Sequence, residues 1–243
     1  MGCAQSRTKP SEERAVIIAE EGLNLHLQEA SRVDSTIRKF SCYDKVNESQ
    51  LKRIAQVLRM HISNYENHNK IWETFHKLQT EGEYSMKDLL VIGILLSKGT
   101  PAEKSTLVFQ VFDETLKGKL PMDTIKGEVL KSMCTHSVKT LGNLVNNGQS
   151  PISNELKNTK YISELSQVEK SVIDKVADKI SASGKEVDER TFQQAMCTFQ
   201  EGALLTTSGW RSFSHEVYVT NPPKKTWSNP FQRKPRQETK PAS

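Results

Sequence analysis

Residues 112–125 decide the fold of this chain and read Phe-Asp-Glu-Thr-Leu-Lys-Gly-Lys-Leu-Pro-Met-Asp-Thr-Ile. On both sides of this stretch, apolar residues recur every three or four positions, which is the spacing of an amphipathic helix. Counted from Asp113, Gly118 occupies position 6 and Leu120 occupies position 8. Because glycine readily adopts the backbone conformation of a sharp turn, the stretch predicts a helix-loop-helix unit.

Three more twelve-residue windows repeat this arrangement. They are residues 39–50, 77–88 and 180–191, and their position-8 residues are Val46, Tyr84 and Val187. The second of these windows also has a glycine, Gly82, at position 6. The starts of the four windows are 38, 36 and 67 residues apart, and the longest step predicts an insertion near residues 141–165.

The repeated loop resembles the calcium loop of the EF-hand family, in which the position-8 residue pairs with a partner loop. Residues 84–133 are most similar to the centre of the N-acylated calcium sensors, namely the recoverin-like neuronal sensors and the calcineurin B-like proteins. The shared features are a loop, an apolar exiting helix and a Lys-Gly turn, here Lys98-Gly99, before the next loop. The resemblance spans about residues 35–200 and implies an all-α fold of paired EF-hand-like helix-loop-helix units.

The N-terminal region also predicts helix. Residues 11–40 carry apolar residues at helical spacing, among them Ile18 and Leu27, after acidic first-turn residues that include Glu13. We therefore expect an acylated N-terminal segment at residues 1–10, a helical region with the first EF-hand-like pair at residues 11–98, and the second pair with its insertion at residues 99–205.

Residues 206–243 predict an extended basic tail. From Asn221 onward the chain has six basic residues, one glutamate and five of its nine prolines. The tail thus carries the formal net charge of +5, and the neutral remainder argues against a nucleic-acid partner. A tail of this composition cannot bury enough apolar surface to fold alone, although residues 215–219 alternate like a short strand. Contact with anionic lipid, an extended position on a partner, and disorder all stay open for it.

The first six residues, Met1-Gly2-Cys3-Ala4-Gln5-Ser6, match the signal for N-myristoylation. Gly2 accepts the myristoyl group after removal of Met1, and Cys3, held beside that lipid, accepts a palmitoyl group. Two acyl chains anchor a protein stably, whereas one holds it only marginally. The longest apolar run, residues 89–96, has eight residues and is far shorter than the roughly 18 of a membrane span. We therefore expect the protein at the cytoplasmic face of a membrane.

Calcium loops of the EF-hand type present oxygen ligands at positions 1, 3 and 5 and a bidentate glutamate at position 12. The third window offers Asp113 at position 1 but has Thr115, Lys117 and Thr124 at the other three positions. The lysine places a positive charge where a ligand should be, and the threonine removes the bidentate carboxylate.

The other windows are equally poor in ligands. The second has Glu81 at position 5 and Asp88 at position 12 but begins with Lys77, and the first and fourth begin with Lys39 and Ile180. We therefore expect no tight calcium binding and no other cofactor. Asp113, Glu81 and Asp88 remain as weak metal candidates.

Loops without metal can still pair and form an apolar groove that receives an amphipathic helix from a partner protein. The apolar helix after the second window offers a candidate groove wall, formed by Leu89, Ile92, Leu95 and Leu96. The alternative is that this helix belongs to the core. No sequence motif of an enzyme is present, and the six histidines are scattered, so we expect no catalytic activity.

These observations favour a doubly acylated adaptor that holds a partner protein at a membrane. Two alternatives stay open. The first alternative is a structural component of a cytoskeletal or ciliary assembly. The second is a calcium sensor with non-standard loops.

Overall fold

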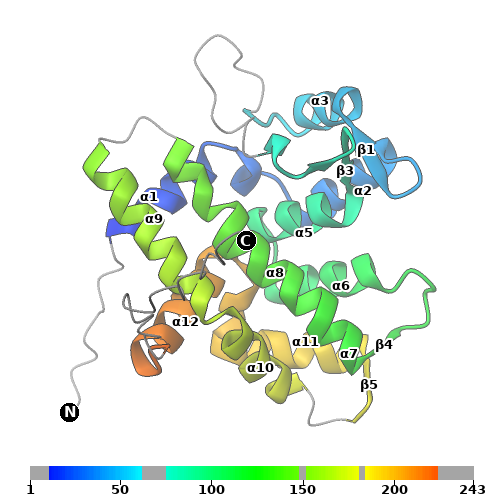
Figure 1. Ribbon diagram of the computed structural model, residues 1–243. Helices are drawn as coiled ribbons and strands as arrows, with labels where there is room; N and C mark the ends of the chain where they lie inside the picture. The colour runs from blue at the N-terminus through cyan, green and yellow to red at the C-terminus, as the bar shows by residue number, and fades with distance from the viewer. Residues whose placement is uncertain (1–10, 62–74, 148–151, 181–183, 224–243) are drawn as a thin grey trace, which may run out of the picture.

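The computed structural model describes residues 11–61, 75–147, 152–180 and 184–223 (Figure 1). Helix accounts for 73% of the structure, so the expected all-α class is confirmed. The lipidation candidates Gly2 and Cys3 lie outside the described residues, and so does the chain from residue 224 onward. No helix within the described ranges is both long and apolar enough to cross a membrane.

In the first half of the chain, α2, α3 and α5 lie around a small sheet, and α1 lies apart from it (Figure 1). Its elements are α1 (Ser11–Glu21), η1 (Leu25–Leu27), α2 (Ala30–Phe40), β1 (Lys45–Asn47), α3 (Glu48–Val57), β2 (Gln79–Thr80), β3 (Glu83–Ser85) and α5 (Met86–Leu96). The three strands form one antiparallel sheet in the order β1-β3-β2.

The second half contains a longer set of helices and a two-stranded sheet. Its elements are α6 (Pro101–Phe112), β4 (Lys119–Pro121), α7 (Met122–Thr124), η3 (Ile125–Leu130), α8 (Lys131–Thr135), η4 (His136–Thr140), η5 (Gly142–Asn147), α9 (Ile152–Gln167), α10 (Glu169–Ile180), β5 (Glu186–Asp188), α11 (Glu189–Thr198), η7 (Phe199–Leu205) and α12 (Thr207–Thr220). Because the backbone stays helical from α7 through η4, with π-helical turns in η3 and η4, residues 122–140 form one long helix.

The strands bring the repeated windows together in pairs. Val46 lies opposite Tyr84 in the β1–β3 pair, and Leu120 lies opposite Val187 in the β4–β5 pair. These are the position-8 residues of the four windows, and all four side chains are buried. The second pair joins windows that are 67 residues apart in the sequence, and η5, α9 and α10 lie between them along the chain.

Side-chain caps set where the helices after the loop strands begin. Asn47 starts α3 by accepting a hydrogen bond from the N–H of Gln50, and the Gln50 side chain accepts one from the Asn47 N–H. Asp188 caps α11 through the N–H of Thr191. Asn47 and Asp188 both stand at position 9 of their windows, so one side chain ends each strand and starts the next helix.

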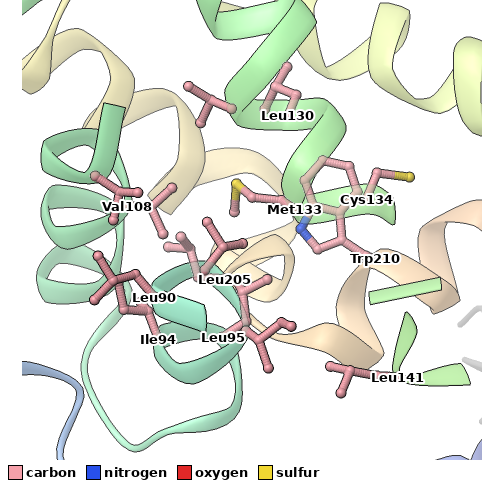
Figure 2. Close-up of a cluster of buried hydrophobic side chains, with 14 of the residues drawn as sticks. Leu90, Ile94, Leu95, Val108, Leu130, Met133, Cys134, Leu141, Leu205 and Trp210 are labelled. Carbon is pink, nitrogen blue, oxygen red and sulfur yellow. The ribbon is translucent and has the colours of Figure 1, made fainter. Parts of the chain in front are cut away.

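The two halves share one hydrophobic core, with α5 at its centre. Figure 2 shows Leu90, Ile94 and Leu95 of α5 packed near Met133 of the long helix and Trp210 of α12. The helix α5 contacts α2, α6 and α8. A single core therefore runs through both predicted halves of the chain.

This arrangement contradicts the predicted partner groove. The side chains of Leu89, Ile92 and Leu95 are 5%, 1% and 2% exposed, and Leu96 is half-buried against the core. The apolar helix is covered by other elements of its own chain, and the cavity of about 20 Å³ that Leu89 and Ile92 line is too small for an amphipathic helix. The uninterrupted apolar run within this helix, residues 89–96, reflects burial on all sides.

The predicted extended tail is also wrong over residues 207–220, which form α12, and the alternating residues 215–219 are part of that helix. Thr206 caps it by accepting a hydrogen bond from the N–H of Gly209. Trp210, Phe213 and Val217 recur at helical spacing and are buried, so this stretch finds its apolar partners in the core. The basic, proline-rich composition begins only after the helix has ended.

Candidate functional site

In the third window, residues 113–124, the loop is closed by the carboxylate of Asp113, the first metal candidate. We call this the third loop. The Asp113 Oδ1 accepts a hydrogen bond from the N–H of Lys117 at 3.1 Å, and its Oδ2 accepts one from the N–H of Gly118 at 2.7 Å. The side chain is 5% exposed, and Gly118 has the positive φ, 66°, that the sharp turn requires. Both carboxylate oxygens thus hold the loop backbone together.

The other two metal candidates do not converge on a common point. Glu81 is exposed in the turn between β2 and β3, with a left-handed φ of 54°. Asp88 lies in the first turn of α5, where its Oδ1 is 3.0 Å from Nε2 of His136 in the long helix. Among the residues that the structure describes, no group of three or more histidines, cysteines, aspartates or glutamates is placed to hold a metal ion.

The structure instead places two carboxylates around a cation of the chain itself. Glu13 and Glu20 on α1 both bind the guanidinium of Arg211 on α12. The exposed fractions are 0% for Arg211, 2% for Glu13 and 6% for Glu20. We call these three residues the arginine cluster.

Every guanidinium N–H of Arg211 has an acceptor in this cluster. Nε and Nη2 donate to the two carboxylate oxygens of Glu13 at 2.8 and 3.1 Å. Nη1 and Nη2 donate to the two oxygens of Glu20 at 2.7 and 2.9 Å. The fifth bond runs from Nη1 to the carbonyl oxygen of Ser137 at 2.9 Å. Arginine offers five such donors in a fixed fork, so its hydrogen-bonding capacity is fully used.

Further hydrogen bonds extend the arginine cluster to α9 and to the start of α12. The Tyr161 hydroxyl donates to Oε2 of Glu13, and the Thr207 hydroxyl donates to Oε2 of Glu20, each at 3.0 Å. The cluster therefore connects α1 to three parts of the second half: the long helix, α9 and α12. Figure 1 shows α1 lying beside α9, and the two helices are in contact.

Burial shapes the titration of the arginine cluster. It raises the pKa of Glu20 above its ordinary value, and the charge of Arg211 and its hydrogen bonds offset that effect only in part. Although burial acts in the opposite direction on Arg211, its two carboxylate partners raise the pKa of the guanidinium above its ordinary value. The arginine therefore stays charged at every pH at which the protein is folded.

Sequence reasoning missed the arginine cluster because it assigned the wrong face of α1 to the core. On α1 the predicted core residue Ile18 is 60% exposed, whereas Glu13 and Glu20 are buried; Leu27, which is 53% exposed, lies beyond the helix in η1. A usable signal was present, since the two glutamates are seven residues apart and therefore share one helix face. The matching positive charge is Arg211, which lies among the buried residues of α12.

No model of a known protein family matches the chain, and comparisons with curated proteins and with solved structures found no match either.

Proposed function

We propose that the chain is a membrane-anchored adaptor, myristoylated at Gly2 and palmitoylated at Cys3, whose EF-hand-like body binds a partner protein without tight calcium binding. The observation that carries this proposal is the closure of the third loop. Asp113, its best metal candidate, uses both carboxylate oxygens on backbone N–H groups. A loop held in this way needs no metal to keep its shape.

The pairing of the loops supports the EF-hand-like part of the proposal. The residues that face each other, Val46 with Tyr84 and Leu120 with Val187, are the ones that an EF-hand frame pairs. The body then acts as a scaffold with constant shape.

The arginine cluster supports the anchoring part. The helix α1 begins at Ser11, directly after the segment proposed to carry the lipids, and Glu13 and Glu20 fix it to α12 through Arg211. A lipid on Gly2 would therefore be connected, through α1 and Arg211, to the rest of the folded chain. Since α5 is buried, the partner protein binds a different surface.

Membrane fractionation tests the anchor. The full chain is expressed in cells as wild type, Gly2→Ala and Cys3→Ser, with Cys42→Ser as the matched control because Cys42 is exposed and far from the N-terminus. We expect wild type and the control to sediment with membranes and to be released by mild detergent. We expect the Gly2→Ala variant to be soluble and the Cys3→Ser variant to be only partly bound, as one acyl chain binds marginally.

Equal soluble fractions for wild type, Gly2→Ala and Cys3→Ser would overturn the proposal. Wild-type protein that stays insoluble in detergent would support the cytoskeletal or ciliary alternative in its place.

A further inference from the structure

A surface groove of about 500 Å³ lies between the long helix, residues 122–140, and the junction of α9 with α10. Its volume falls within the range of small-molecule sites, roughly 300–1,000 Å³. Lysines line both of its sides: Lys126, Lys131 and Lys139 belong to the long helix, and Lys170 belongs to the first turn of α10. We call this feature the lysine groove.

The charges of the lysine groove do not balance. Two lysines are paired with the acidic residues of the opposite wall, Lys126 with Asp174 at 2.6 Å and Lys139 with Glu169. Within the part of the chain that the structure describes, no ion pair engages Lys131 or Lys170. Four lysines against two carboxylates leave an excess of two positive charges in the lining.

The excess positive charge lies away from the Lys126–Asp174 pair. Asp174 above all, with smaller effects from Asp178 and Asp123, raises the pKa of Lys126, so carboxylates already surround this lysine. The rest of the lining has Lys131, Lys139 and Lys170 with Glu169 as its carboxylate. It also includes the first turn of α10, where N–H groups without intrahelical acceptors favour an anion.

The π-helical turn η3 forms part of one wall of the lysine groove. Hydrogen bonds in a π-helical turn join residues five apart, and Lys126 and Lys131, which are five apart, both line the groove. Between them, Gly127 lines the groove, and a Cβ added there would have no atom within 4 Å. Glycine weakens a helix interior, and no close neighbour requires it at this position.

We propose that the lysine groove binds a phosphorylated molecule of sugar or inositol size. A phosphomonoester carries about 1.5 to 2 negative charges at neutral pH, so the excess of two positive charges in the lining suffices for one phosphate group, and the other phosphates of a multiply phosphorylated ligand would stay in solvent. The same chemistry occurs in the headgroup of an inositol phospholipid and in free inositol phosphates. In the lipid form, the inference rests on the proposed membrane anchoring, and the groove would add headgroup recognition to the acyl anchor.

Binding to soluble inositol trisphosphate tests the groove without the anchor. The full chain, made in bacteria without lipid, is titrated by calorimetry at about 0.15 M salt, where diffuse surface attraction is screened. For Lys131→Glu/Lys170→Glu we expect affinity to fall at least about tenfold, because two charge-assisted contacts to phosphate are lost. The matched control, Lys98→Glu/Lys185→Glu, changes two exposed lysines outside the groove by the same charge and should bind like wild type.

A filled groove provides the second variant. Gly127→Leu places a side chain in the open space at that position without changing any charge, so we expect it to weaken binding while leaving the thermal unfolding of the protein cooperative. Absence of inositol trisphosphate binding by wild type would overturn the proposal. So would an equal loss of affinity in the groove pair and the control pair, which would indicate diffuse charge only.

Vesicles distinguish the two sources of the ligand. The same unacylated chain is mixed with vesicles containing phosphatidylinositol bisphosphate and with phosphatidylserine vesicles of equal total charge. Binding only to the first, and its loss in Lys131→Glu/Lys170→Glu, assigns the lipid headgroup. Binding to the soluble phosphate but to neither vesicle assigns a free ligand. Because no acyl group is present, this result is independent of whether Gly2 and Cys3 carry lipid.

Discussion

In the third loop, Asp113 uses its carboxylate to hold two backbone N–H groups, whereas at the α1–α12 interface Glu13 and Glu20 share the guanidinium of Arg211. In the EF-hand family, which the repeated windows resemble, the loops collect carboxylates around a cation. Here the collected carboxylates lie on α1, and the cation is a side chain of the protein. A metal ion can leave its loop, but Arg211 cannot leave the chain, so the α1 contact is permanent while the body is folded.

The strongest test of this comparison is to remove the positive charge of Arg211. Arg211→Met leaves two buried carboxylates without their partner, and breaking a buried ion pair in this way costs about 3–5 kcal/mol. We expect a loss of that size in the free energy of unfolding, measured by urea denaturation. Arg190→Met is the matched control, because Arg190 is exposed on α11 and such changes usually stay within about 0.5 kcal/mol.

A third variant separates the ion pair from its burial. When Glu13, Glu20 and Arg211 are all replaced by apolar residues of similar size, no charge is left uncompensated, and such replacements are often neutral. We therefore expect Glu13→Leu/Glu20→Leu/Arg211→Met to be more stable than Arg211→Met alone. Equal stabilities of Arg211→Met and Arg190→Met would contradict a buried, fully paired arginine cluster.

A second buried cation, Lys104, makes a useful comparison, because it donates to backbone carbonyl oxygens. Lys104 is 4% exposed, and its Nζ donates to the carbonyl oxygens of Leu95 and Leu205 at 3.2 and 3.3 Å. Burial lowers the pKa of this lysine to about 8. The two cations therefore differ in whether they can lose their proton within the stable range of a protein.

The pH dependence of stability follows from that lowered pKa. Between about pH 8 and pH 10.5 the unfolded chain holds the Lys104 proton and the folded chain has released it, so stability rises with pH. Relative to Lys104→Met, the wild type should gain about 3 kcal/mol over this window, because a tenfold change in proton affinity corresponds to about 1.4 kcal/mol. Urea denaturation of both proteins at several pH values measures the difference, and parallel curves would show that Lys104 keeps its proton.

The sequence is informative where one residue type performs one local task. The repeated windows predict which residues face each other across the strands, because position 8 is fixed by the loop that precedes it. Gly118 is identifiable for the same reason, and its φ of 66° fits the turn. These features depend on neighbours within a few residues, so a pattern along the chain is enough to find them.

Features that depend on distant partners could not be predicted. The composition of residues 206–243 does not reveal the helix α12. Trp210 and Phe213 are buried in a core formed with distant parts of the chain, and no local pattern identifies those partners. Glu13 resembles an ordinary first-turn residue, although its partner Arg211 is 198 residues away. The lysine groove likewise combines residues of the long helix with Lys170 of α10.

We expect the proposed lipid anchor at Gly2 and Cys3 to be permanent and independent of calcium. The most direct test measures the membrane-bound fraction of the full wild-type chain in cell lysates, once with calcium and once with a calcium chelator, and uses Gly2→Ala to define the unbound level. We predict the same membrane-bound fraction in both conditions, because the third loop is closed by Asp113 and α1 is held by Arg211. A fraction that rises or falls with calcium would contradict a permanent anchor and would favour a calcium sensor with non-standard loops.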